Sequence, residues 1–186
     1  MTITVSGLPG SGKTALVRRL SDHLNQPWVS IGDIRGRMAT ERGLTIDELN
    51  AQSHLNTRFD REVDEYQTQL AQQEPDTIFD GWMSWFFIPK SFKLFLTVDL
   101  KEAGKRIFAA RQHDQTRSDE PMYQSAEDAE ATIKKRLLDS QERYLALYGV
   151  DFLEKTHYDL ILDTTHMTPD EVYAAVEESL KNHQAS

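Results

Sequence analysis

The chain has 186 residues, enough for one α/β domain with a full hydrophobic core and short for two. Its formal net charge of -9 disfavours nucleic acid as a main partner, and the absence of cysteine excludes disulfides, thiolate nucleophiles and cysteine-bound zinc. No apolar stretch is long enough to span a membrane and no secretory signal is visible, so we expect a cytoplasmic protein without a membrane partner.

A glycine-rich segment near the amino terminus fits the pattern G-x-x-x-x-G-K-[ST]. It follows a β-branched run at 2–5 and precedes leucines spaced four apart, a context that predicts a strand before it and a helix after it. Glycines let main-chain N–H groups turn inward around an anion, and the start of the helix adds further N–H groups. We predict that ATP binds here, at Gly7, Pro9, Gly10, Ser11, Gly12, Lys13, Thr14 and Ala15.

Two side chains of this segment carry the expected chemistry. Lys13 would bring a positive charge to the β- and γ-phosphates, and the Thr14 hydroxyl would bind Mg²⁺. Asp80, which follows a short apolar strand at 77–79, would be a second Mg²⁺ ligand. The alternative is that Asp80 is a structural carboxylate that caps a neighbouring N–H group.

The rest of the chain alternates between predicted strands and helices. Further strands are predicted at 28–31, 92–100 and 158–163, and helices at 34–42, from 45, at 101–112, at 125–148 and from 168. Another helix carries Phe59, Val63, Tyr66 and Leu70 on one face. Five strands separated by helices predict a parallel sheet covered on both faces, with Asp33, Asp80 and Asp163 beside the glycine-rich segment at its carboxyl edge.

An aromatic run at 82–89 allows two interpretations. Aromatic side chains usually fill a core, but such a run also suits a wall against which a flat ligand packs.

Four arginines lie on both sides of a polar segment at 113–121: Arg106, Arg111, Arg136 and Arg143. Most arginines are solvated surface charges, yet cations around a transferred phosphoryl group are what its equatorial oxygens require. We predict a lid at about 112–135 that closes over the site and excludes water.

The sequence resembles the archaeal-type cytidylate kinases, within the adenylate kinase group of nucleoside monophosphate kinases. The similarity covers nearly the whole chain and includes the glycine-rich segment, 32–34, 41–43, 60–62, 144–149 and 158–169. It implies a single three-layer P-loop NTPase domain at 1–186, with a five-stranded parallel sheet in the order 2-3-1-4-5 and an acceptor-binding segment at about 31–73. It also implies transfer of a phosphoryl group from ATP to CMP, with Mg²⁺.

Site roles follow from the resemblance position by position. Ser30 and Asp33 would border the acceptor pocket, with Asp60 and Arg61 on its covering helix. The four arginines named above would act on the phosphates, and Thr164 would lie near the adenine.

Two positions depart from the pattern of the family. Gly36 and Trp82 stand where the family has arginines that contact the phosphate of the acceptor. Either Arg35, Arg37 or Arg61 replaces them, or the acceptor is not CMP.

Three hypotheses therefore stay open. The first is a kinase that phosphorylates a nucleoside monophosphate, CMP or dCMP; the second is a kinase for another small molecule with a hydroxyl group. The third is an ATP-binding regulatory module without turnover. In each case we expect a monomer or a small homo-oligomer.

Overall fold

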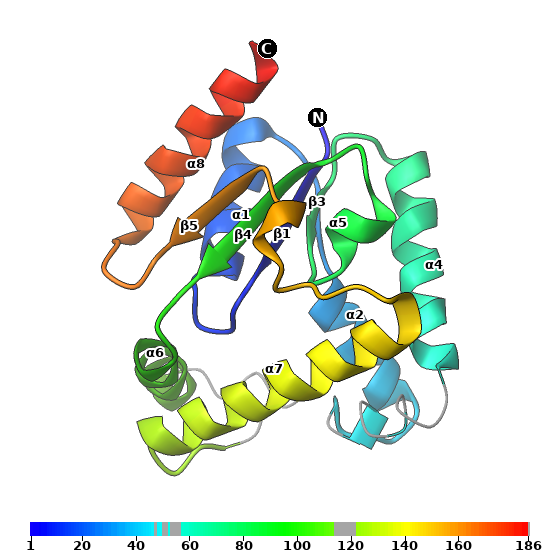
Figure 1. Cartoon of the computed structure of the whole chain (residues 1–186), viewed down its shortest axis with the longest axis vertical. Coiled ribbons are helices and arrows are strands. Elements are labelled where there is room, and N and C mark those ends of the chain that lie inside the picture. Colours follow the sequence, from blue (N-terminus) through cyan, green and yellow to red (C-terminus); the bar gives the residue numbers. More distant parts are fainter. Residues whose placement is uncertain (47, 50–51, 53–56, 114–121, 186) are drawn as a thin grey trace.

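A computed structural model describes residues 1–46, 48–49, 52, 57–113 and 122–185 of the chain. Its five strands form one parallel sheet in the order β2-β3-β1-β4-β5, as predicted (Figure 1). The strands are β1 (Ile3–Gly7), β2 (Trp28–Ser30), β3 (Ile78–Asp80), β4 (Phe92–Thr97) and β5 (Leu160–Asp163). The register pairs Val5 with Asp80 and with Leu94, so β1 lies between β3 and β4 at the centre of the sheet.

Helices cover the sheet. They are α1 (Lys13–Leu24), α2 (Ile31–Glu41), α4 (Arg58–Gln73), α5 (Ser84–Phe87), α6 (Leu100–His113), α7 (Ala126–Tyr148), the 3₁₀ helix η1 (Lys155–His157) and α8 (Pro169–Gln184). Figure 1 shows α6 and α7 beyond the end of β4, on the side of the molecule away from both chain termini. The carboxyl ends of the strands therefore face α6 and α7.

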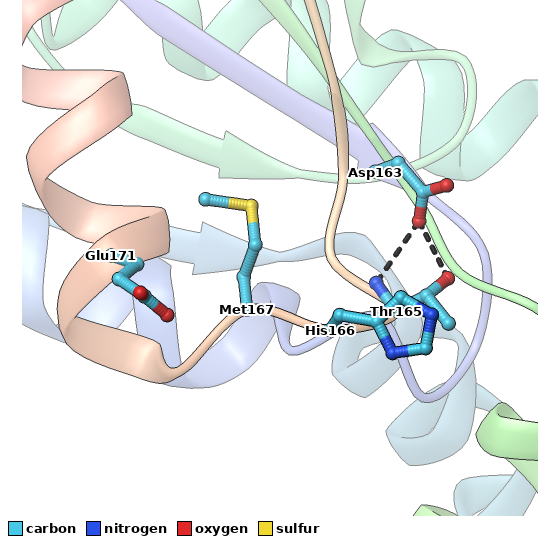
Figure 2. Close-up of a pocket in the computed structure, with 5 residues that line it drawn as sticks. All are labelled: Asp163, Thr165, His166, Met167 and Glu171. Atoms are coloured by element: carbon cyan, nitrogen blue, oxygen red, sulfur yellow. Dashed lines mark hydrogen bonds between the residues drawn. The ribbon is translucent and has the colours of Figure 1, made fainter.

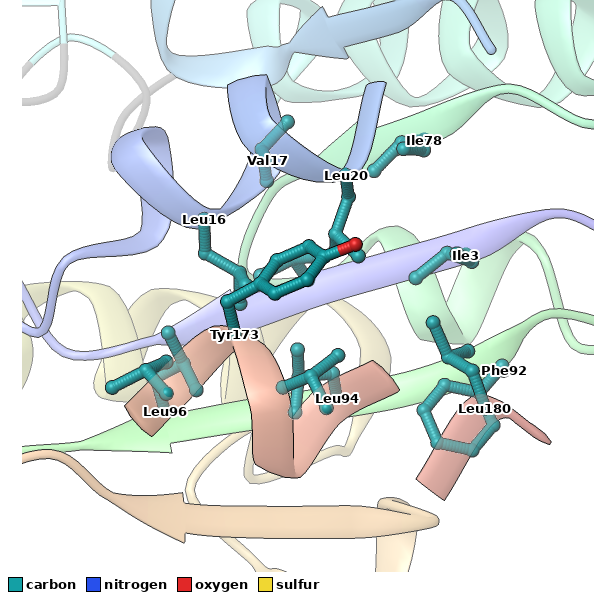
Figure 3. Close-up of a cluster of buried hydrophobic side chains, with 13 residues drawn as sticks. Ile3, Leu16, Val17, Leu20, Ile78, Phe92, Leu94, Leu96, Tyr173 and Leu180 are labelled. Carbon is teal, nitrogen blue, oxygen red and sulfur yellow. The ribbon is translucent and has the colours of Figure 1, made fainter. Parts of the chain in front are cut away.

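Side chains of α1 and α8 pack against β1 and β4 in the largest apolar cluster (Figure 3). Leu16, Val17 and Leu20 come from α1, and Val172, Tyr173, Val176 and Leu180 come from α8. These spacings of three and four residues put the apolar side chains of each helix on one face, which explains why both helices bury that face against the sheet.

Helix ends follow the signals in the sequence. Gly43 and Gly149 have φ of +68° and +66°, so each ends a helix in the left-handed conformation, as expected. At the start of α8, the Thr168 hydroxyl accepts a hydrogen bond from the Glu171 N–H and the Glu171 carboxylate accepts one from the Thr168 N–H, with Pro169 in the first turn.

Several predicted elements have other bounds in the structure: the strand predicted at 92–100 ends at Thr97, and the one predicted at 158–163 begins at Leu160. The strand predicted at 28–31 ends at Ser30, and α2 begins at once because the Ser30 hydroxyl caps it by accepting a 3.1 Å hydrogen bond from the Asp33 N–H. The run at 82–89 contains the short helix α5, with Trp85 buried.

Of the apolar face predicted for α4, Val63 is buried and Leu70 packs against the core, but the other buried residues of this helix are polar. Its buried residues are Asp60, Val63, Asp64 and Gln67, whereas Tyr66 is 47% exposed. Polar side chains can be buried here because neighbouring elements supply ionic and hydrogen-bonding partners, a tertiary effect that apolar periodicity does not reveal.

Within the described part of the chain, no helix has the length and hydrophobicity needed to cross a membrane.

Candidate active site

A cavity of about 1200 Å³ opens at the carboxyl edge of the sheet. Its walls come from the segment after β1, the start of α2, the end of β3, one face each of α6 and α7, and the β5–α8 connection. Among the described residues, nine cationic side chains line it: Lys13, Arg18, Arg19, Arg35, Arg106, Arg111, Lys135, Arg136 and Arg143. The carboxylates that line it are Asp33, Asp80 and Asp139. A chain with a formal net charge of -9 thus encloses a strongly positive cavity, which favours an anionic ligand.

The loop between β1 and α1 forms one end of this cavity. Gly7, Gly10 and Gly12 all have positive φ, and a Cβ on Gly7 would lie 2.4 Å from the carbonyl oxygen of Leu96. Gly12 caps α1 without a side-chain hydrogen bond, so the first N–H groups of the helix keep their capacity to donate. This geometry suits a phosphate group.

The Lys13 ammonium group lies folded over the same loop. Its Nζ donates to the carbonyl oxygens of Gly7 and Leu8 at 3.0 and 3.1 Å. Burial lowers the pKa of Lys13, the Asp80 carboxylate raises it, and the positive charge of Arg136 lowers it again. A phosphate in the loop would compensate the burial of this charge, so the lysine is suited to turn toward one.

Two oxygen ligands suited to Mg²⁺ lie at this end of the cavity. Asp80 is 8% exposed at the end of β3, and the half-buried Thr14 is in the first turn of α1. The described residues hold no group of three or more histidines and carboxylates that could by themselves bind a metal ion. Two protein ligands fit Mg²⁺ nevertheless, because this ion keeps several waters and takes its other oxygens from nucleotide phosphates.

Arg106 fastens the loop to the β5–α8 connection. Its guanidinium group donates to the carbonyl oxygens of Thr164 and Thr165 at 2.9 Å each, and to that of Gly10 at 3.4 Å. The Thr164 hydroxyl donates to the Ser11 carbonyl at 3.0 Å. Arg106 and Thr164, both predicted site residues, are therefore at the cavity and also hold its wall together.

A smaller hollow of about 360 Å³ adjoins the β5–α8 connection, and Figure 2 shows its lining. Asp163 accepts hydrogen bonds from the Thr165 N–H at 3.0 Å and the Thr165 hydroxyl at 2.6 Å, and these bonds lower the pKa of its carboxyl group. Met167 lines both this hollow and the large cavity. The predicted adenine region thus has a rigid polar turn on one side and a flexible apolar side chain on the other.

Trp82 belongs to the cavity wall, but most of the aromatic run does not. The Trp82 indole N–H donates to the Gly7 carbonyl at 2.9 Å, and its ring stacks on Phe152 with 5.0 Å between centroids. Trp85 lies outside the lining residues and stacks on His157 at 4.2 Å. Trp85 thus fits the core interpretation, and a ligand-packing role for the run stays a prediction that concerns Trp82.

On the acceptor side, Ser30, Asp33 and Arg35 line the cavity. Arg37 and Arg61 are exposed and are not among its lining residues, and Asp60 is buried behind Arg35. The predicted roles of these residues stay predictions.

The face of α7 contributes more than the sequence analysis named. Besides Arg136 and Arg143, it presents Thr132, Lys135, Asp139, Ser140 and Tyr144 to the cavity. The helical spacing that links the two arginines also links these residues, so the signal was present in the sequence. The predicted lid at 112–135 and the acceptor-binding segment at 31–73 include residues outside the described ranges, Arg117 and Asp47 among them, and remain predictions.

The fold and the glycine-rich loop define a nucleotide-binding kinase of the P-loop class. Solved structures show the same fold: shikimate kinase from Bacteroides thetaiotaomicron superposes with a TM-score of 0.63 at 18% identity, covering 97% of this chain and 98% of that one. A profile of the cytidylate kinase-like family matches residues 2–166. The chain belongs to this family, and it is a phosphotransferase.

Curated relatives agree with this assignment over most of their length. The cytidylate kinase of Pyrococcus furiosus is 35% identical over 97% of this chain and 88% of its own, and the figures for the cytidylate kinase of Thermococcus kodakarensis are the same. The family predicted from sequence motifs is thereby confirmed.

Proposed function

We propose that the protein transfers the γ-phosphoryl group of ATP to a pyrimidine nucleoside monophosphate, with CMP or dCMP as the acceptor. The observation that carries the proposal is the single positive cavity, which extends without interruption from the β1–α1 loop to the start of α2. One nucleotide would lie with its phosphates in the loop and the other at α2, phosphate to phosphate. The family membership and the names of the relatives support the choice of CMP.

In this arrangement, main-chain N–H groups of the β1–α1 loop hold the β- and γ-phosphates of ATP. The Lys13 ammonium turns from the Gly7 and Leu8 carbonyls to these phosphates. Thr14 and Asp80 would hold Mg²⁺, which supplies positive charge at the phosphate oxygens.

The arginines that line the cavity on α6 and α7 act on the charge that shifts during transfer. An oxygen of the acceptor phosphate forms a bond to the γ-phosphorus while the bond to the β-phosphate oxygen breaks, and ADP leaves with the electron pair. Arg111 and Arg136 lie where they can neutralise this charge, since both line the cavity near the loop. Positioning and electrostatics account for most catalysis of this type.

An acceptor panel tests the proposal directly. Purified protein is mixed with ATP, Mg²⁺ and, in separate reactions, CMP, dCMP, UMP or AMP, and ADP formation is followed. We expect the highest rates with CMP and dCMP. Rates at the level of the acceptor-free control for all four would contradict the proposal.

A second candidate function is phosphorylation of a small molecule other than a nucleotide. Trp82 favours it, because an uncharged ring lines the cavity where an arginine would suit a phosphate-bearing acceptor. ADP release that depends on such a hydroxyl compound, with no response to the four nucleotides, would support this alternative.

A further inference from the structure

Arginines on α2 and α4 differ in their access to the acceptor end of the cavity. Arg35 is 8% exposed and lines the cavity, whereas Arg37 and Arg61 are exposed to solvent outside it. Trp82 brings no charge, because its indole N–H is bonded to the Gly7 carbonyl and its ring stacks on Phe152. On α2 and α4, Arg35 is thus the cation placed to meet a ligand at this end.

Arg35 is held from behind by a buried carboxylate. Its Nη1 lies 2.7 Å from Oδ1 of Asp60, and Nε of Arg143 lies 3.5 Å from the same oxygen. The side chains of Arg35, Asp60 and Arg143 are 10%, 1% and 5% exposed. One carboxylate on α4 therefore fixes two guanidinium groups, one from α2 and one from α7.

The charges of this cluster are arranged in two layers. Arg35 and Arg143 line the cavity, while Asp60 and the neighbouring Asp64 do not. Asp64 is committed to hydrogen bonds from the Tyr148 hydroxyl and from Gln67. Positive groups thus face the cavity with negative groups behind them, an arrangement that favours an anion in front.

Some buried polar atoms of the cluster also lack a hydrogen-bond partner among the described residues. Oδ2 of Asp60 and Nε of Arg143 are buried and make no hydrogen bond within the described part of the chain. Unsatisfied buried groups cost stability, and functional sites are where such costs are found. The Arg143 guanidinium also lies over the Tyr144 ring, 4.9 Å from its centroid, which restricts its movement.

We propose that Arg35 and Arg143 bind the phosphate group of the acceptor and that Asp60 is the positioning residue that holds both guanidinium groups toward it. This rests on the proposed function and specifies it. The acceptor must carry an anionic phosphate next to the atom that is phosphorylated, so the site distinguishes a nucleoside monophosphate from the corresponding nucleoside. It also assigns to Arg35 the role for which Arg37 and Arg61 were alternatives.

Binding of CMP and of cytidine, each measured by titration calorimetry, tests the assignment without turnover. Wild-type protein is expected to bind CMP more tightly than cytidine. Arg35→Ala should weaken CMP binding roughly 10- to 100-fold, the effect of a lost charge-assisted hydrogen bond, and leave cytidine binding unchanged. Arg58→Ala is the matched control and should change neither affinity, because the Arg58 side chain on α4 is 75% exposed and does not line the cavity.

Arg37→Ala and Arg61→Ala are tested in parallel as the competing assignments. A larger loss of CMP binding in either variant than in Arg35→Ala would overturn the proposal. Equal weakening of CMP and cytidine by Arg35→Ala would also overturn it, because a merely structural role gives that result.

Kinetics of Asp60→Asn test the positioning role. The variant should raise KM for CMP about 10-fold or more while KM for ATP stays within about twofold, and Asp60→Glu should restore part of the loss. Because Asp60 acts through Arg35, the effect of Asp60→Asn should be smaller in an Arg35→Ala background than alone. Melting curves verify that each variant folds. If Asp60→Asn proves unstable, Arg35→Ala still tests the proposal, because that variant keeps the Asp60–Arg143 pair.

The two proposals fail separately. If the wild type phosphorylates CMP but Arg35→Ala binds CMP like Arg58→Ala, the assignment of the phosphate site is wrong and the proposed function stands. If the wild type neither binds nor phosphorylates any of the four monophosphates, the proposed function is wrong and this inference is wrong with it.

Discussion

The carbonyl oxygen of Gly7 accepts two hydrogen bonds, one from the Lys13 ammonium and one from the Trp82 indole. When Lys13 turns to a phosphate, Trp82 is the donor that still satisfies this oxygen. A single main-chain atom thus connects the phosphate-binding loop, its lysine and Trp82, two residues after the end of β3.

Lys13→Ala tests the catalytic part of this arrangement. Turnover should fall at least about 10³-fold, because the ammonium would no longer stabilise charge on the transferred phosphoryl group. Lys105→Ala is the control, since this exposed lysine of α6 pairs only loosely with Glu102 at 3.5 Å. Near-normal turnover of Lys13→Ala in a coupled ADP assay would mean that the loop does not bind the phosphates of the donor.

Trp82→Phe tests the indole hydrogen bond. The ring can still stack on Phe152, but once Lys13 turns to a phosphate the Gly7 carbonyl has no donor left, and leaving a buried acceptor unsatisfied costs about 1–3 kcal/mol. We expect weaker ATP binding, by roughly 5- to 150-fold, in titration calorimetry. Trp85→Phe is the matched control, because the buried Trp85 indole N–H has no hydrogen-bond partner among the described residues. Equal ATP affinity in both variants would contradict the role of Trp82.

Among the elements, α4 shows how a helix can bury a polar face. Asp64 lies on it, 8% exposed, and accepts hydrogen bonds from Tyr148 of α7 and Gln67 of its own helix. Gln67 in turn accepts a 2.8 Å bond from the Ser84 hydroxyl of α5. A continuous polar network thus joins α4, α5 and α7.

The network predicts a pH dependence of stability. Burial raises the pKa of Asp64 to about 6, against the effect of the Tyr148 hydrogen bond. The folded protein therefore takes up a proton near pH 6, which the unfolded chain takes up only near pH 4. The contribution of this group to the free energy of unfolding is largest below pH 4 and is lost as the pH rises through 6, by a total on the order of 3 kcal/mol.

Asp64→Asn should remove this dependence, because the amide oxygen can still accept a hydrogen bond but carries no charge. The measurement is the free energy of unfolding in urea at several values between pH 4 and pH 8, for the wild type and the variant. Glu65→Gln, on the exposed side of the same helix, should leave the wild-type dependence unchanged. A parallel pH dependence in Asp64→Asn would show that Asp64 is not the titrating group.

At the scale of the whole molecule, the main apolar core meets the positive cavity at Leu16 and Val172, which belong to both. The rest of the cluster of α1, α8, β1 and β4 does not line the cavity, and the cavity collects charges from α1, α2, α6 and α7 at the carboxyl edge. Binding of a nucleotide should therefore stabilise the folded chain without repacking its main core.

A thermal-shift experiment measures this linkage. At a concentration about 100 times its dissociation constant, ATP with Mg²⁺ should add about 2.7 kcal/mol, which corresponds to a rise in Tm of roughly 5–10 °C. Lys13→Ala should show a smaller rise. No rise for the wild type at saturating ATP and Mg²⁺ would contradict nucleotide binding, and the kinase proposal would fail with it.

Several features of the protein follow from the sequence alone. The strand, glycine-rich loop and helix at the amino terminus were predicted correctly because local chemistry decides them: β-branched residues, glycines at positive φ and leucines with helical spacing. The order of the strands followed from the resemblance to a family, and helix ends followed from Gly43, Gly149 and Thr168.

Tertiary structure decided which of the predicted acceptor-binding residues reach the cavity. Arg35, Arg37 and Arg61 are equivalent in a sequence, and only the packing of α2 against α4 places Arg35 in the cavity wall and leaves the other two outside. The burial of Asp60 and Asp64 on α4 was not predicted for the same reason, because their partners lie far away in the chain. Local periodicity records which residues share a helix face, but which face is buried depends on what the rest of the fold brings against it.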